Sequence, residues 1–262
     1  MKQLYFIFTM IALLSYGQIS ANAQSLSEQA DSAYNADNYR EAADLYLNII
    51  QNEGASATLY YNLGNCYYRS SEMGKAILAY ERSLRLDPTN DDAKNNLNFV
   101  NARIADRPGE RGSFVGNALD STSNMAHSNT WAWMAFGAFM LTLIGVLAYI
   151  FSSVIIVRKI GFFGGIFTLI ATGIFIFFAY RSAAIAVADD AAIITVPSTI
   201  LSTSPRVPKD RSQEAMLLHE GTKVKILDSV RSTTDSVNSL WYDVEVDNNH
   251  RAWINAAAVE KI

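Results

Sequence analysis

The chain has 262 residues, of which 50% are hydrophobic and 18% charged, and its formal net charge is −4 at pH 7. This mildly acidic balance argues against binding to nucleic acid or to strongly anionic lipid surfaces. Cys66 is the only cysteine, so no disulfide can form within the chain.

The N-terminus has the layout of a bacterial secretory signal. Lys2 precedes an apolar core at 4–16, and Ala21-Asn22-Ala23 supplies the small residues that a signal peptidase reads. We predict a signal peptide at 1–23, cleaved before Gln24. An uncleaved anchor helix is the alternative, and in either case the segment that follows is exported.

A 34-residue period follows the signal. Ala30 matches Gly64 at this spacing, and Tyr46 matches Tyr80. The second copy is the clearer one: it contains Tyr60, Leu63, Gly64, Tyr67, Ala76, Tyr80, Leu84 and Pro88. This pattern is typical of tetratricopeptide repeats, each a helix-turn-helix in which small residues let helices cross beside large aromatic ones.

We predict an all-α repeat module at 24–106 that ends in one capping helix, which begins near Asp92. Repeat stacks need about three units to bury a continuous core. Two repeats and a cap are near this minimum, so we expect the module to lean on a partner or on a membrane domain.

The resemblance to tetratricopeptide arrays implies a partner-binding concave wall, formed by the first helix of each repeat. By repeat phase this wall contains Asp31, Tyr61, Asn65, Tyr68 and Arg69. A partner groove is one interpretation, because Asn65 and Arg69 are polar residues with no obvious structural role. The other is that Tyr61 and Tyr68 simply pack between repeats.

The connector at 107–130 is rich in Gly, Ser and Asn. Several apolar residues, from Phe114 to Ala126, fall on one helical face, and Ser113 can act as an N-cap. The pattern predicts a short amphipathic helix on the membrane surface. A plain flexible linker is the alternative.

Two apolar runs between Trp131 and Tyr180 meet at Arg158-Lys159, which is the only charged pair in this stretch. One helix of this length would span about 75 Å, far more than a bilayer core of about 30 Å. We therefore predict a hairpin of two transmembrane helices, at 131–157 and 160–181. Its basic turn would be cytoplasmic by the positive-inside rule, with interfacial anchors at Trp131 and Trp133.

This topology predicts a bacterial inner-membrane protein whose two soluble domains are both periplasmic. Gly161 and Gly165 have the spacing at which membrane helices approach closely, although glycine is common in such helices. Neither run contains a charge, which favours an anchor over a transport pathway.

From residue 190 to 262 the pattern changes to short alternating strands. We expect five of them, at 193–196, 216–218, 222–227, 241–246 and 251–254, forming a small all-β barrel. The tail resembles bacterial SH3-like (SH3b) domains in its Leu218-His219-Glu220-Gly221-Thr222 start, its Trp241-Tyr242 strand and its Trp253-Ile254 end.

One departure from that resemblance concerns a ligand site. The SH3-like family often has Arg-x-Gly-Pro after its first strand, where this chain has Leu201-Ser202-Thr203-Ser204-Pro205. Trp241 and Trp253 would line a peptide or glycan groove in one interpretation, and they would be core residues in the other.

The whole arrangement is a multidomain membrane protein: signal, tetratricopeptide repeats, membrane hairpin and SH3-like tail. In this order the parts resemble the BatE proteins of Bacteroidota aerotolerance operons. The resemblance implies work at the cell envelope with other Bat-type membrane proteins and with von Willebrand-type proteins.

The sequence contains no catalytic signature. His127, His219 and His250 fall in a linker, a strand end and a turn, and there is no nucleophile elbow or phosphate loop. We expect no enzyme, cofactor, metal or nucleic acid, but a membrane-anchored scaffold that binds proteins of an envelope complex. The alternative function is a sensor whose SH3-like domain binds cell-wall peptide or glycan.

Overall fold

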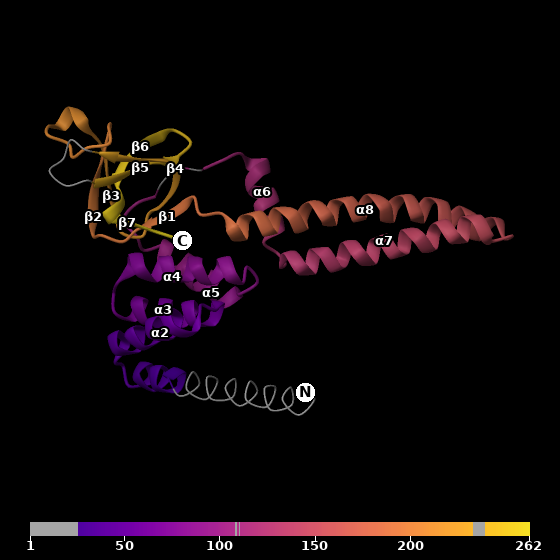
Figure 1. Ribbon diagram of the computed structural model, residues 1–262, viewed down its shortest axis with the longest axis horizontal. Coiled ribbons are helices and arrows are strands. Elements are labelled where there is room, and N and C mark those ends of the chain that lie inside the picture. Colours follow the sequence, from indigo (N-terminus) through magenta and orange to yellow (C-terminus); the bar gives the residue numbers. More distant parts are fainter. Residues whose placement is uncertain (1–25, 108, 110, 233–238) are drawn as a thin grey trace, which may run out of the picture. The chain divides into compact units, whose positions relative to one another are not determined.

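The computed structural model describes residues 26–107, 109, 111–232 and 239–262, so the predicted signal peptide lies outside the described residues. The described chain forms two compact units (Figure 1). One unit joins the residues up to Leu86 with Asn90–Gly109 and Asp190–Ile262. The other contains Asp87–Thr89 and the described residues between 110 and 189.

The first unit begins with paired helices. They are a helix at 26–35, then α2 (Tyr39–Glu53), α3 (Ala57–Arg69), α4 (Met73–Leu86) and α5 (Asp91–Asn101). Side chains cap two of them: the backbone N–H of Leu59 donates to Ser56 Oγ, and that of Ala93 donates to Asn90 Oδ1. Each cap satisfies a donor that the first helical turn leaves without a partner.

The small and large residues of the repeat pattern meet in the core. Ala30, Ala42 and Tyr46 are buried in the first repeat, and Ala76 and Tyr80 are buried in the second. A Cβ added to Gly64 would lie 2.6 Å from Cε1 of Tyr80, so the ring packs directly on the glycine of the preceding helix. The predicted all-α repeat architecture is confirmed.

The C-terminal tail is a seven-stranded antiparallel sheet in the order β3-β2-β6-β5-β4-β1-β7. The strands are β1 (Ala191–Ile194), β2 (Ser198–Ser202), β3 (Glu214–His219), β4 (Lys223–Ser232), β5 (Ser239–Asp247), β6 (His250–Asn255) and β7 (Val259–Lys261). Short 3₁₀ turns η1 (Arg211–Gln213) and η2 (Ala256–Ala258) precede β3 and β7. The structure therefore adds β2 and β7 to the five strands expected.

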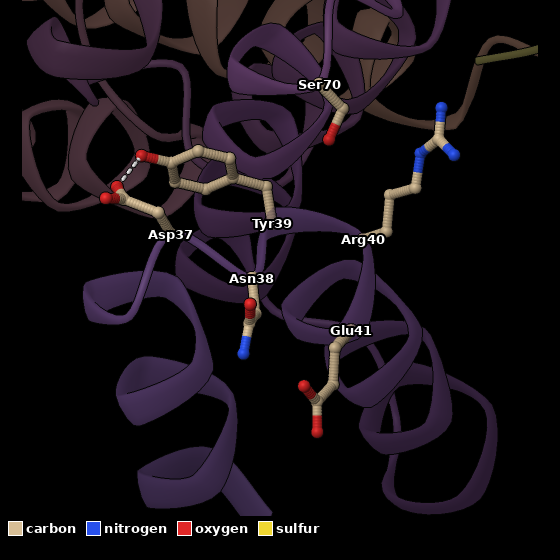
Figure 2. Close-up of a pocket in the computed structure, with 6 residues that line it drawn as sticks. All are labelled: Asp37, Asn38, Tyr39, Arg40, Glu41 and Ser70. Atoms are coloured by element: carbon tan, nitrogen blue, oxygen red, sulfur yellow. Dashed lines mark hydrogen bonds between the residues drawn. The ribbon is translucent and has the colours of Figure 1, made fainter.

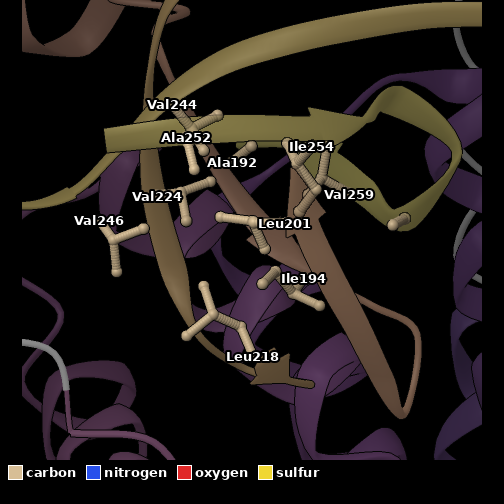
Figure 3. Packing of buried hydrophobic residues seen from close by; sticks show 11 residues of the cluster. Ala192, Ile194, Leu201, Leu218, Val224, Val244, Val246, Ala252, Ile254 and Val259 are labelled. Atoms are coloured by element: carbon tan, nitrogen blue, oxygen red, sulfur yellow. The ribbon is translucent and has the colours of Figure 1, made fainter. Parts of the chain in front are cut away.

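One apolar core holds the sheet together, and Figure 3 shows its side chains converging. Alternate residues point inward, as Val244 and Val246 do on β5 and Ala252 and Ile254 do on β6. Because all seven strands contribute to this single cluster, the sheet must curve around it. The expected small β domain is confirmed at this level.

The sheet also packs on the repeat helices within the first unit, next to α4 (Figure 1). Ile193 of β1 is fully buried in the same cluster as Ile77 and Tyr80. Gly221 has a φ of 87°, and a Cβ there would lie 2.7 Å from Ile77 Cδ1 and 2.8 Å from Ile104 Cγ2. The turn before β4 thus approaches the helices too closely for a side chain.

Polar contacts surround this apolar patch. The backbone N–H of Gly74 donates to Glu220 Oε2 at 3.1 Å, and Lys223 Nζ lies 2.8 Å from Glu81 Oε2. At the chain end, Arg82 Nη2 donates to the Lys261 carbonyl oxygen at 2.6 Å. The sheet therefore covers α4 as a further layer of the repeat stack.

The second unit is a helical hairpin with a short helix at its open end. Its elements are α6 (Phe114–Ser123), α7 (Ser128–Phe151) and α8 (Ile155–Val187). Both α7 and α8 are long and apolar enough to cross a membrane. The turn lies at 152–154, where the backbone N–H of Val154 donates to Ser152 Oγ, and Arg158-Lys159 falls in the first turns of α8.

Candidate partner-binding groove

The repeat helices enclose a polar groove of about 220 Å³. The helix at 26–35 contributes Asp31, Tyr34 and Asn35, α2 contributes Tyr46, and α3 contributes Asn62 and Asn65. Amide, hydroxyl and carboxylate groups therefore face one opening. Such groups can donate to and accept from the backbone of an extended peptide.

Two residues that line this groove, Asp31 and Tyr46, form a hydrogen-bonded pair. The Tyr46 hydroxyl donates to Asp31 Oδ1, and Asn62 Nδ2 donates to the Tyr46 hydroxyl oxygen at 3.4 Å. Burial, followed by the bond to Asp31, raises the pKa of Tyr46, so the phenol stays protonated as a donor. Within the described residues, Oδ2 of Asp31 has no hydrogen-bond partner, which leaves an acceptor for a ligand.

Asn65 also lines the groove, and it has a structural role. Its Oδ1 accepts from the Tyr80 hydroxyl at 2.7 Å and from Asn96 Nδ2 at 2.9 Å. The sequence argument that Asn65 has no structural duty is therefore wrong, although Asn65 still lines the groove. The sequence analysis did not single out Asn96. Asn96 lies 34 residues after Asn62, so the repeat period places it at the equivalent position of the next helix pair.

Tyr61 and Tyr68 make ring contacts within the repeat stack. The Tyr61 ring centroid lies 6.2 Å from that of Tyr80, and the Tyr68 centroid lies 5.7 Å from that of Phe99 in an edge-on arrangement. Both residues are half-buried, and neither lines the groove. Their role on a partner-binding surface stays a prediction.

A second hollow, of about 480 Å³, surrounds the turn before α2 and is lined by residues 37–41 and Ser70 (Figure 2). Arg69 does not line this hollow but contacts two residues that do. The guanidinium carbon of Arg69 lies 4.5 Å from the Tyr39 ring centroid, and Nη2 lies 3.5 Å from Asp37 Oδ1. Figure 2 shows the Tyr39 hydroxyl pointing at Asp37, to which it donates. This bond raises the pKa of Tyr39. Arg69 therefore ties the second repeat to the turn of the first.

Residues 27–91 match the tetratricopeptide repeat family model. No curated protein matches the chain. The matched range contains every residue that lines the polar groove. Tetratricopeptide repeats are typically non-catalytic modules that bind other proteins, so the match supports a protein-interaction role for this part of the chain.

Trp241 and Trp253 differ in exposure. Trp241 is 2% exposed, and its Nε1 donates to Ser239 Oγ at 2.9 Å. Trp253 is half-buried on β6, opposite Asp243 in the β5–β6 register. A ligand groove between the two indoles finds no support in this arrangement, because one of the rings is inside the domain.

Gly161 and Gly165 lie where α8 meets α7. A Cβ added to Gly161 would lie 2.6 Å from the Gly145 carbonyl oxygen, whereas one on Gly165 would have 3.8 Å to the Thr142 carbonyl oxygen. Close by, the hydroxyl oxygens of Thr142 and Thr168 are 2.8 Å apart. Among the described glycines of the hairpin, Gly161 is the one at which an added Cβ would come nearest to the backbone of the other helix.

In the described ranges, no three His, Cys, Asp or Glu side chains form a group that could hold a metal ion. Cys66 is fully buried, and burial raises the pKa of its thiol to about 12. At neutral pH the thiolate, which is the reactive form, is therefore scarce.

Proposed function

We propose that this protein is a membrane-anchored scaffold that holds a segment of a partner protein in the polar groove of its repeats. The observation that carries the proposal is the open groove of amide, hydroxyl and carboxylate groups inside the tetratricopeptide match. The apolar helices α7 and α8 supply the anchor. The repeats and the sheet then hold the bound segment beside the membrane.

The occupant that best fits the groove is an extended peptide segment. Asn35 and Asn62 offer amide groups that can pair with a peptide backbone, and Asp31 offers a negative charge to a basic side chain. Because such hydrogen bonds are directional, a small groove of this kind favours a short motif over a broad flat surface.

The anchor also supports a proposal for the side of the membrane on which the other domains lie. The start of α7 and the end of α8 lie at the same end of a hairpin, while Arg158-Lys159 marks the other end. We infer that this basic end is cytoplasmic. The repeats and the SH3-like tail are then periplasmic, on the outer side of a bacterial inner membrane.

The resemblance of the domain order to BatE proteins supports envelope proteins as the partners, including Bat-type membrane proteins. In this proposal the chain carries out no reaction itself. It brings partners together at the membrane, and its link to aerotolerance comes through them.

The groove is tested by crosslinking and pull-down from intact envelopes with Asn35→Ala/Asn62→Ala. The matched control is Asn48→Ala/Asn52→Ala, since these exposed asparagines on α2 bond to each other and do not line the groove. We expect the groove variant to lose at least one partner that the control retains. Equal recovery of every partner by both variants would refute the groove.

The sidedness is tested separately, by alkaline phosphatase fused after Ile262. The enzyme is active only outside the cytoplasm, so we expect activity. An inactive fusion, together with a cytoplasm-dependent reporter that is active at the same place, would refute the topology and leave the groove experiment unaffected.

A further inference from the structure

Three large apolar side chains on and just after α6 are exposed to solvent. Phe114 is 85% exposed, Val115 65% and Met125 74%. Within α6, at about 100° per residue, Ala118 projects between Phe114 and Val115, roughly 40° from the first and 60° from the second. They form an apolar face, here called the α6 face, that no other described residue covers.

The opposite side of α6 is fixed to the hairpin by polar contacts. Arg181 Nε donates to Asp120 Oδ1 at 2.8 Å, and Arg181 Nη2 donates to the Gly116 carbonyl oxygen at 3.3 Å. Trp131 Nε1 donates to the Ser123 carbonyl oxygen at 3.1 Å. These contacts hold α6 on the end of α8, so the α6 face points away from the hairpin.

The spacing of the charged residues on α8 indicates the depth of α6 relative to the membrane. Between Lys159 and Arg181 lie 21 uncharged residues, 160–180. As a helix they measure about 32 Å, close to the thickness of a bilayer core of about 30 Å. If Lys159 lies at one membrane surface, Arg181 therefore lies at the other. Exposed Trp133 and Tyr180 mark the same level, where aromatic residues collect.

We propose that α6 is an interfacial helix whose apolar face lies in the boundary between headgroups and acyl chains of the phospholipid bilayer. The inference rests on the proposed membrane insertion of α7 and α8. The lipid surface is the occupant because the exposed α6 face is held by Arg181, which lies at the level of the membrane surface. The Arg181–Asp120 pair is the positioning element, and its mutual neutralisation lowers the cost of holding both charges at this depth.

This placement has a consequence for the scaffold. An amphipathic helix that lies in the interface binds by its buried apolar area. The α6 face would therefore add to the membrane attachment that α7 and α8 provide.

Fluorescent probes on single introduced cysteines test the inference in the full chain, reconstituted in phosphatidylcholine nanodiscs. Val115→Cys lies on the α6 face, and Asn117→Cys is the matched control, since two residues separate side chains by roughly 160° around a helix. Cys66 can stay, because it is fully buried and labels slowly. Ile170→Cys, 60% exposed in the middle of α8, reports membrane insertion itself.

We expect headgroup-level nitroxide lipids to quench the probe at Val115 several-fold more strongly than the probe at Asn117, and aqueous iodide to show the reverse order. Equal exposure of both probes to iodide would overturn the inference. A Val115 probe shielded from iodide but insensitive to lipid nitroxide would also overturn it, since a second protein copy would then cover the face. If deep nitroxide lipids fail to quench Ile170, the membrane insertion itself is refuted.

The positioning pair has its own measurement. Asp120→Asn removes the charge that holds Arg181, and Asp120→Glu restores it. We expect Asp120→Asn to lower the lipid quenching at Val115 and Asp120→Glu to recover it, with Ile170 unchanged in both. Unchanged Val115 quenching in Asp120→Asn would overturn the role assigned to the pair.

Discussion

Asp37 and Ser71 stand 34 residues apart, and each has a positive φ, of 62° and 64°. The turns around them are equivalent as well: Asn38 N–H donates to the Ala33 carbonyl oxygen, and Glu72 N–H donates to the Tyr67 carbonyl oxygen, both at 2.9 Å. The left-handed conformation is costly for residues other than glycine. Each repeat therefore stores strain at the same place.

The two turns should respond differently to glycine. Ser71→Gly relieves the strain, so we expect it to raise the free energy of unfolding by roughly 0.5–1 kcal/mol, measured by chemical denaturation. Asp37→Gly also removes the side chain that contacts Tyr39 and Arg69. Its increase in the free energy of unfolding should therefore be smaller than that of Ser71→Gly, or zero. A loss of stability in Ser71→Gly would contradict this account.

Asp106 connects the end of the repeats to the sheet. Its Oδ2 accepts from the His219 backbone N–H at 2.5 Å and from the Thr222 hydroxyl at 2.7 Å, and Oδ1 lies 2.8 Å from His219 Nδ1. Burial opposes ionisation, but these hydrogen bonds outweigh it and lower the pKa of Asp106. The carboxylate is therefore the form that the folded state favours.

The sign of the pH effect follows from that shift. A carboxyl whose folded pKa is lowered contributes its full stability above the unfolded value of about 3.9, and this contribution is lost as pH falls toward the folded value. Asp106→Asn should cost about 1.5–3 kcal/mol at pH 7, because it removes charged hydrogen bonds. The wild-type chain and the variant should converge in stability at acid pH. A constant difference from pH 7 to pH 3 would show that the charge of Asp106 plays no part.

At the level of single residues, the sequence predicted the sizes of the side chains that pack between repeat helices. It did not predict which polar side chains have hydrogen-bond partners. The repeat pattern predicted small residues beside large aromatic ones, and the structure packs Tyr80 on Gly64. Asn65 and Arg69 looked unoccupied only because their partners, such as Asn96 and Tyr39, are about 30 residues away in sequence. Periodicity gives the face on which a residue lies but not its hydrogen bonds.

At the scale of the element, the closest approach of α7 and α8 depends on Gly161. Leucine there would drive its Cβ against the Gly145 backbone, whereas Gly164 has nothing within 4 Å of a Cβ. We expect Gly161→Leu to separate the two helices and Gly164→Leu to leave them together. The measurement is the disulfide yield of a Thr142→Cys/Thr168→Cys pair, whose hydroxyls now lie 2.8 Å apart. An equal yield in both leucine variants would contradict the packing role.

The structural elements that the sequence did not predict were missed for the same reason. β2 follows Pro197 and is rich in Ser and Thr, so it reads as a loop, and β7 has only three residues. The turn of the hairpin is at 152–154, whereas charge alone pointed to 158–159. Short or polar segments become regular because a neighbouring strand or helix supplies their partners, and periodicity cannot detect that.

At the scale of the whole molecule, the sequence suggested a repeat module and a tail that are separate along the chain. The structure joins them, through residues more than 100 positions apart such as Gly74 with Glu220 and Asp106 with Thr222. The sequence predicted that the short repeat stack leans on a partner or on a membrane domain, but within the first unit it is the sheet of the same chain that covers the stack.

This union predicts that the first unit folds without the membrane hairpin. A chain that joins 24–109 to 190–262 through a flexible linker should be soluble and should unfold in one cooperative transition, because Ile193 and Gly221 place both parts in one core. The repeats alone, 24–109, should melt at a lower temperature, since Ile77 and Tyr80 would lose their cover. Two separate calorimetric transitions in the joined chain, or equal melting temperatures of the joined chain and the repeats, would show that the sheet does not stabilise the helices.

Within the joined chain, Glu220→Ala and Asp106→Asn together should lower the melting temperature toward that of the isolated repeats, since both side chains hold the sheet to the helical part.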